Sequence, residues 1–349
     1  MRFGHFFYPT SLDPAQDGQV IADCLAEAEL AEDLGLDAIW MAEHHFVGEV
    51  AYGDPLVFAG AVAARTRRIM LGLGIVEMAL HNPVHLAIQT ALLDVLSNGR
   101  LIVGTGRGSN YNAFEYVGFG TTVGEGLERL DEAEELLVKA WTTENLDFKG
   151  KYWQVSFPLL RPRPHQQPHP PLARACISED SITAMARIGR PVLLRYRSVP
   201  VMRRTLGLYR DTMLASGFDE AVVEENLDRI WFWCECHVAE SDERAMEEFL
   251  GPFHEASRYM ADVRERWNPA DQPVPMAPPP LPRSAYGSSP DPDAPEVLMG
   301  SPRRVAEHIA MLRDAGARNL MLTNRGLVSK EQSEASMRLL STEIMPLFR

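Results

Sequence analysis

Cysteine is scarce in this chain of 349 residues, which contains four. Cys234 and Cys236 share one face of an expected strand, but no second cysteine or histidine pair stands at ligand spacing, so structural roles are expected. The chain also lacks an apolar run long enough to span a bilayer, and no basic leader with a cleavage site precedes the first apolar stretch. We therefore expect a cytoplasmic protein that does not enter membranes.

Basic residues are few relative to acidic ones. The chain has 34 Lys+Arg against 48 Asp+Glu, which gives a formal net charge of −14. A surface of that sign repels polyanions, so neither nucleic acid nor an anionic membrane is an expected partner. The charge does not identify a substrate.

One succession of predicted elements repeats along the chain: a helix, then a glycine, then a buried strand. Asp54-Pro55, Asn82-Pro83 and Ser301-Pro302 are typical helix starts. Eight strands are expected, near residues 1–8, 38–42, 69–75, 101–104, 172–177, 192–196, 231–238 and 319–323, with a hairpin inserted around Lys149-Gly150. This alternation predicts parallel strands covered by helices, in an open doubly wound sheet or a closed barrel. Eight successive units favour a single α/β domain over residues 1–349, a (β/α)8 TIM barrel.

One segment departs from this order. Residues 268–296 hold a dense run of prolines, which do not donate ladder hydrogen bonds. We expect an excursion before the last βα unit, either a simple linker or a mobile lid over the barrel mouth.

The second strand ends in Glu43-His44-His45-Phe46, at the carboxyl end where such barrels place their chemistry. Histidine exchanges protons near neutral pH, and a carboxylate beside it can orient the ring. The alternative is a histidine pair that only shapes a loop. No metal is expected, because adjacent side chains point to opposite sides and no third ligand is evident. His81 and His85 are spaced for one helix face without a paired glutamate, so both are expected at the surface.

Two further strand ends suggest an anion site. Strand four ends in the glycine-rich segment 104–110, where Arg107 has the geometry to hold a phosphate, although NYNAFEY after it is not expected to open a helix. Strand five runs into Ser178 and Ser181 at an expected helix start, whose free N–H groups bind anions. Plain helix capping by these serines is the alternative.

At this point a family resemblance appears. RFGHFFYP, LGLDAIWMAEHHF, the segment from Ile69 to Gly108 and MGSPRRVAEHIAMLRDAGARNLMLTNRG cover most of the chain in order. They resemble the bacterial luciferase-like family of flavin-dependent monooxygenases, which adopt a (β/α)8 barrel. The Pro-rich stretch falls where luciferase has its mobile loop, which favours the lid.

The resemblance implies roles for individual residues. His44 is the implied catalytic histidine beside the flavin. The implied cofactor-binding residues are Glu43, Gly74 and Ile75 (joined by a non-proline cis peptide), Arg107, Ser178, Ser181 and Tyr196. The expected substrate pocket comprises Phe6, Tyr8, His45, Met78, Ser109 and Tyr111.

Three positions depart from luciferase. Gly106 replaces a reactive cysteine and opens space on the flavin, Ile177 replaces an acidic residue near the phosphate, and Ser109 replaces a leucine by the ring. Light emission and an aldehyde substrate are therefore not implied.

The implied activity is monooxygenation by reduced FMN and O2, through a C4a-(hydro)peroxyflavin, of a mainly apolar organic substrate. A separate NAD(P)H:flavin reductase would supply the FMNH2. Two alternatives stay open: an F420-dependent oxidoreductase on the same barrel, and a flavin-binding protein without catalysis. Small residues in the helix at 56–66 lie where luciferase-like subunits pair, so a homodimer is expected.

Overall fold

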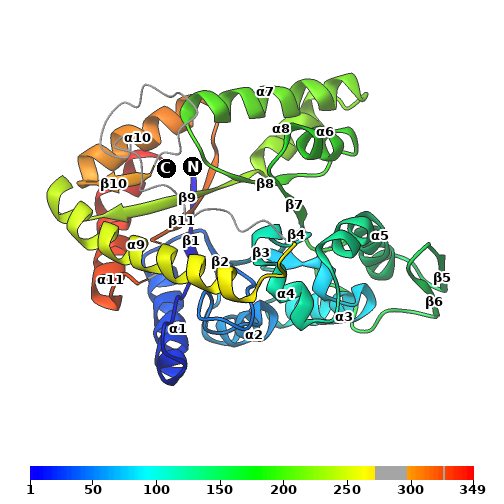
Figure 1. Cartoon of the computed structure of the whole chain (residues 1–349). Coiled ribbons are helices and arrows are strands. Elements are labelled where there is room, and N and C mark those ends of the chain that lie inside the picture. The colour runs from blue at the N-terminus through cyan, green and yellow to red at the C-terminus, as the bar shows by residue number, and fades with distance from the viewer. Residues whose placement is uncertain (272–296, 325–326) are drawn as a thin grey trace.

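The computed structural model describes residues 1–271, 297–324 and 327–349 (Figure 1). Of the Pro-rich stretch expected to form a mobile loop, only residues 268–271 belong to these ranges. Its proposed role as a lid therefore falls outside the described residues.

A closed barrel of parallel strands forms the centre of the chain. Its strands are β1 (Arg2–Phe7), β2 (Ala38–Met41), β3 (Met70–Glu77), β4 (Leu101–Gly106), β7 (Leu172–Cys176), β8 (Val192–Arg195), β9 (Trp231–Val238) and β11 (Asn319–Thr323). They pair in the order β9-β11-β1-β2-β3-β4-β7-β8, and pairing of β8 with β9 closes the ring. The predicted (β/α)8 barrel is confirmed, and the open sheet is excluded.

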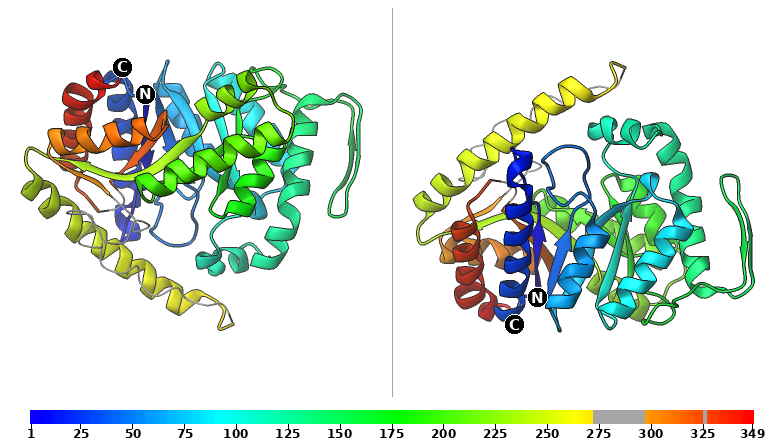
Figure 2. Two further views of the ribbon diagram at one scale, coloured as in Figure 1. Left: turned by 90° about the horizontal axis from the view of Figure 1, so that it is seen from above. Right: turned by 90° about the horizontal axis from the view of Figure 1, so that it is seen from below.

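Two additions accompany the barrel. The short strand β10 (Leu298–Gly300), which the sequence did not suggest, pairs with β9 outside the ring. The predicted hairpin is present as antiparallel β5 (Leu146–Lys149) and β6 (Gln154–Phe157). It projects away from the barrel in both views of Figure 2.

The helices surround the strands, and their starts follow the caps in the sequence. Asp54 Oδ1 accepts the backbone N–H groups of Leu56 and Val57 at the start of α2 (Pro55–Arg65), and Asn82 caps α3 (Pro83–Leu96) in the same way. The other helices are α1 (Asp17–Asp33), α4 (Ala113–Gly118), α5 (Val123–Thr142), α6 (Glu179–Arg187), α7 (Val199–Ala215), α8 (Glu220–Asp228), α9 (Asp242–Trp267), α10 (Pro302–Asp314) and α11 (Lys330–Leu339). Within the described ranges, no helix is long and apolar enough to cross a membrane.

Helix α4 corrects one expectation. The segment NYNAFEY was not expected to open a helix, yet a turn at Asn110–Asn112 leads directly into α4. The Ser109 hydroxyl accepts the backbone N–H of Tyr111, which caps this turn. Ser109 therefore has a structural role in addition to the pocket position expected for it.

Alternation along the strands divides the core in two. Side chains such as Phe6, Trp40, Leu193, Trp231 and Met321 fill the barrel interior. Alternate positions pack outward against the helices in the larger cluster. Large interior side chains close the barrel, so no channel runs through it, and polar groups can gather only at its ends.

Candidate functional site

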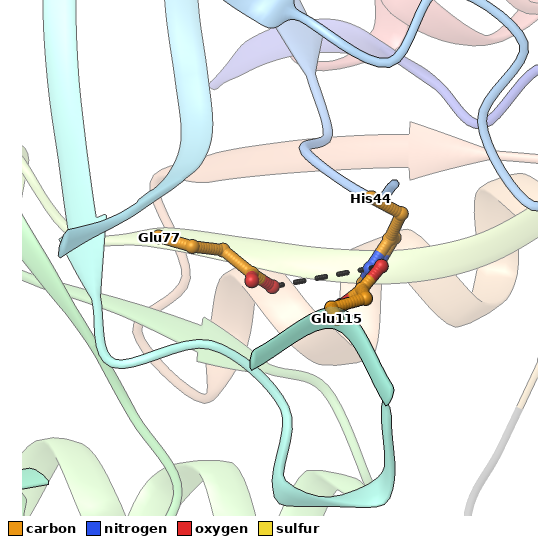
Figure 3. A group of neighbouring side chains, drawn as sticks. All are labelled: His44, Glu77 and Glu115. Atoms are coloured by element: carbon orange, nitrogen blue, oxygen red, sulfur yellow. Dashed lines mark ion pairs between the residues drawn. The ribbon is translucent and has the colours of Figure 1, made fainter. Parts of the chain in front are cut away.

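His44 lies just beyond the carboxyl end of β2, where three carboxyl groups converge on one of its ring nitrogens. Its Nδ1 lies 3.3 Å from Glu115 Oε1 and 3.9 Å from both Glu77 Oε1 and Glu49 Oε2. Figure 3 shows Glu77 at the end of β3 and Glu115 on α4 reaching the ring from different elements. The side chain of His44 is 15% exposed, so these charges act with little screening by water.

This environment determines the charge of His44. Burial alone would lower the pKa of the ring, but Glu49, Glu115 and Glu77 outweigh it and raise the pKa to about 10. A pKa raised in this way favours the imidazolium form near neutral pH. Such a group donates a proton or a charged hydrogen bond and does not act as a base.

Glu77 was not suggested by the sequence, and its carboxyl group accepts no hydrogen bond from the described residues. Its Oε2 is buried without a partner. Burial raises the pKa of Glu77 well above its ordinary value, and the nearby Glu115 adds to the effect. A possible signal was its position, since Glu77 is an acid directly after the apolar strand segment Leu71–Val76.

Glu43 has the opposite environment. Its carboxylate accepts the backbone N–H of Glu77 at 2.7 Å and lies 3.0 Å from His45 Nε2 and 2.7 Å from His81 Nε2. Burial would raise the pKa of Glu43, but the bonds to His45 and His81 lower it to about 2. His81 is thus half-buried and paired, which corrects its expected surface position. Glu43 orients its neighbours, and its direct contact with a cofactor stays a prediction.

The end of β3 provides a flat backbone surface at the barrel mouth. The Gly74–Ile75 peptide bond is cis, as the resemblance implies. The register between β3 and β4 shifts between Leu73 and Val76, and both Gly74 and Ile75 pack toward the barrel interior. A Cβ at Gly106 would lie 2.4 Å from Ile75 Cδ1, so the space that Gly106 leaves is occupied by Ile75.

The expected anion site lies on adjacent strand ends, because β4 pairs with β7. The guanidinium of Arg107 forms no hydrogen bond or ion pair with any part of the chain that is described, and the side chain is half-buried. Ser178 caps α6, and its hydroxyl accepts the backbone N–H of Ser181. Ile177 beside it is 91% exposed. Capping is therefore confirmed for Ser178, and phosphate binding at this position stays a prediction.

The expected pocket residues separate into two groups. Tyr8 packs edge-on against His44 with ring centroids 5.8 Å apart, and its hydroxyl donates to Glu49. Phe6 lies in the barrel interior, and Tyr111 is 49% exposed beside the mouth. His45 turns toward Glu43 and packs against Phe119.

Two expected site residues point away from this mouth. Met78 is buried in the cluster between barrel and helices, because the register shift before Val76 changes the alternation. Tyr196 is buried in the same outer cluster, and its hydroxyl lies 2.8 Å from His308 Nε2 on α10. The structure does not bring either residue to the group around His44.

Charged and aromatic residues at the ends of β8 and β9 were missed. The Arg195 guanidinium lies 5.1 Å from the centre of the Trp233 ring and 3.5 Å from Glu235 Oε1. Alternation along WFWCECHV was the available signal, because it places Trp231, Trp233 and Glu235 on one face of the strand.

The side chains around His44 also bear on metal binding. His44, Glu77 and Glu115 each have a ligand-type atom within 4.8 Å of the others, in a search of the described ranges. Two carboxyl groups from distant parts of the sequence therefore stand beside His44, where the sequence showed no third ligand. The expectation that no metal is bound stays a prediction.

Helix α9 is attached to the same region. Arg264 Nε donates to Asn112 Oδ1 at 2.9 Å, and Asn268 Nδ2 donates to the carbonyl of Tyr111 at 2.8 Å. Phe114 packs with Met260 and Val263. The end of α9 therefore rests on α4 and the turn before it.

Comparison with known proteins identifies the family. The profile of luciferase-like monooxygenases matches residues 1–319. The chain belongs to this family. The oxygenase component of the flavin-dependent trigonelline monooxygenase of Acinetobacter baylyi is 30% identical over 173 residues, which cover 49% of this chain and 48% of that protein. F420-dependent enzymes also occur among the relatives.

Solved structures agree over the whole chain. The monooxygenase RslO1 of Streptomyces bottropensis superposes with a TM-score of 0.85 and 29% identity, covering 100% of both chains. The oxygenating constituent of 3,6-diketocamphane monooxygenase from Pseudomonas putida, in complex with FMN, has a TM-score of 0.79 and 19% identity, covering 99% and 98%. By contrast, the chain spans only 46% to 53% of the first curated relatives it matches.

Proposed function

We propose that the protein is a flavin-dependent monooxygenase that uses reduced FMN and O2 to oxygenate an organic substrate. One arrangement carries this proposal: along the carboxyl ends of β2, β3, β4 and β7 stand, in order, a histidine among carboxyl groups, the half-buried Gly74 and Ile75, an arginine without a partner in the described chain, and a helix N-terminus. A planar ring with a phosphate at one end matches this order.

The residues at the mouth fit such a cofactor. Gly74 and Ile75 are half-buried, whereas Leu73 and Val76 on either side are buried, so this part of β3 remains accessible. The guanidinium of Arg107 has no partner within the described chain. On the neighbouring strand end, the first turn of α6 has backbone N–H groups besides the Ser181 N–H, which Ser178 already caps. Arg107, Ser178 and Ser181 would hold the phosphate, and the Gly74–Ile75 peptide would support the ring.

The protein's own residues then supply positioning and a proton. Reduced flavin supplies the electrons that activate O2. His44 would donate from Nε2, which makes no hydrogen bond or ion pair with any described residue, while Nδ1 faces the carboxyl groups. Tyr8, Phe6 and Trp233 provide apolar surface for a substrate, and the barrel floor beneath them excludes water.

Two partners belong to this proposal. The trigonelline relative is an oxygenase component, which supports a separate reductase as the source of FMNH2. A second copy of the chain is the other partner, because α3 exposes Leu92 and Leu96 one turn apart and the adjacent α2 exposes Val57.

The test is an anaerobic titration of the purified protein with FMNH2, followed by mixing with 18O2 in the presence of candidate substrates. We expect binding of FMNH2 and one labelled oxygen atom in the product. Hydride transfer with reduced F420 and no oxygen incorporation would instead support the F420-dependent oxidoreductase. Tight binding of oxidised flavin with no product would support a binding protein.

A further inference from the structure

The three carboxyl groups around His44 have different surroundings. Glu49 accepts hydrogen bonds from the Tyr8 hydroxyl and from Asn112 Nδ2, the latter at 2.9 Å. Its Oε1 also lies 3.9 Å from Arg264 Nη2 on α9. Glu49 therefore has a cationic partner of its own, apart from the histidine.

Glu115 is the acceptor nearest to the ring. Its Oε1 lies 3.3 Å from His44 Nδ1 and accepts the backbone N–H of His45 at 2.7 Å. The side chain is completely buried on α4, and its position is set by that backbone bond. No other cation lies within ion-pair distance of Glu115 in the described ranges, so His44 is its only charged partner.

Glu77 differs from both. Its Oε1 is 3.9 Å from His44 Nδ1, beyond hydrogen-bond distance, and its buried Oε2 has no partner among the described residues. Glu115 Oε2 is also buried without a partner, but Glu115 Oε1 accepts the His45 N–H and lies nearer to the ring, whereas neither oxygen of Glu77 accepts a hydrogen bond from the described chain. A carboxylate in the place of Glu77 is disfavoured, because no donor of the described chain replaces its lost hydration. The raised pKa of Glu77 agrees with this geometry.

We propose that Glu115 is a positioning residue: it is the counter-ion that keeps His44 as an imidazolium with Nε2–H free at the barrel mouth, while Glu77 remains a neutral carboxylic acid. The charges of the cluster are then paired: Arg264 compensates the carboxylate of Glu49, and His44 compensates that of Glu115. The use of Nε2–H in catalysis rests on the proposed function, but the protonation pattern does not.

Asn112 provides the competing arrangement. Its Nδ2 also lies 3.3 Å from His44 Nδ1 and would donate to that nitrogen in a neutral ring. The amide orientation is fixed by Arg264 Nε, which donates to Oδ1, and by the bond from Nδ2 to Glu49. A charge-assisted bond to a carboxylate is about twice as strong as a neutral one, so the pair with Glu115 prevails.

The test follows the His44 ring by NMR in flavin-free protein with labelled histidine, using H44A to assign the signal. In the wild type we expect the ring to stay protonated well above the ordinary histidine range. Glu115→Gln should lower the pKa of His44 by at least about one unit, a tenfold change in proton affinity. Glu77→Gln is the matched control, because its amide resembles the neutral acid, and should leave the pKa nearly unchanged.

Further variants and measurements separate effects on folding from effects on the protonation of His44 and on turnover. Glu115→Gln retains an oxygen for the His45 N–H, and Glu115→Asp, which keeps the charge, should restore part of the shift. In the pH profile of kcat, Glu115→Gln should lose activity on the alkaline side, where the wild type does not, because His44 of the variant loses its proton at a lower pH. An inactive protein with the expected NMR pattern would reject only the proposed function.

Three results would overturn the inference. One is a wild-type His44 that titrates near the ordinary value of about 6.5. Another is a shift in Glu77→Gln as large as that in Glu115→Gln. The third is a His44 signal that responds to stoichiometric Zn²⁺ and loses this response in Glu77→Gln, which would make the cluster a metal site.

Discussion

His81 Nε2 lies 2.7 Å from Glu43 Oε1 and so joins the segment after β3 to the end of β2. Because the same carboxylate accepts the backbone N–H of Glu77, one buried side chain aligns the strand ends that carry His44 and the cis peptide. This pair is close to the site but lies beneath its surface, since Glu43 is 3% exposed.

Replacing Glu43 should destabilise the protein and change its acid sensitivity. The folded pKa of Glu43 is lowered to about 2, so its contribution to stability is present above its unfolded pKa and is lost as the pH falls toward about 2. Glu43→Gln should cost about 3 kcal/mol at neutral pH, because the amide places a donor against donors. The free energy of unfolding of the variant should also fall less steeply than that of the wild type as the pH is lowered. Urea unfolding across the acid range measures both, with the exposed Glu135→Gln as the control.

His44 should matter for turnover more than for cofactor binding. His44→Ala removes the proton donor, which typically contributes about a hundredfold or more to rate. The affinity for FMNH2 should change little, because the phosphate contacts lie on other strands. Single-turnover kinetics and FMNH2 titration separate the two effects. His85→Ala is the comparison, since His85 is exposed on α3; equal rates in both variants would reject the role of His44.

Arg107 should discriminate FMN from riboflavin. A charged hydrogen bond to phosphate contributes about 1.5–3 kcal/mol, so Arg107→Ala should weaken FMNH2 binding by roughly 10- to 150-fold. Reduced riboflavin, which lacks the phosphate, should bind both proteins alike. Anaerobic fluorescence titration measures this, and the exposed Arg68→Ala, before β3 at the opposite end of the barrel, should behave as wild type. Equal losses for both flavins would argue against a phosphate site at Arg107.

The faces of α2 and α3 should hold two subunits together. Val57 on α2 is 71% exposed, and on the adjacent α3 Leu92 is 45% and Leu96 61% exposed, one helical turn apart. Val57→Glu and Leu92→Glu should each convert a dimer into a monomer, as measured by light scattering after gel filtration. Met311→Glu on α10, where the native side chain is 55% exposed, should leave the mass unchanged. A wild-type monomer would contradict this prediction directly.

The barrel could be predicted because its signals are local. Asp54-Pro55 and Asn82-Pro83 fix helix starts within a few residues, and each strand lies close to its helix in sequence. Met78 shows the limit of such signals. Met78 was expected in an apolar pocket at the mouth, but the register shift between β3 and β4 is a feature of the paired strands, and Met78 packs outward after it.

The site was predictable only in part. His44 stands in a recognisable tetrapeptide, but Glu77 on β3 and Glu115 on α4 meet its ring, beside Glu49, only in the folded barrel. No spacing in the sequence connects them. The charge of the histidine is therefore a property of the fold, whereas its position was visible in the sequence.

Asn112 links access and chemistry in one amide. Its oxygen is bonded to Arg264 on α9, and its nitrogen lies between Glu49 and the His44 ring. Moving the end of α9 away would break the first bond, while the bond from Nδ2 to Glu49 would still hold the amide. Under the proposed function, a molecule that displaced α9 would therefore change the surroundings of the proton donor through Asn112.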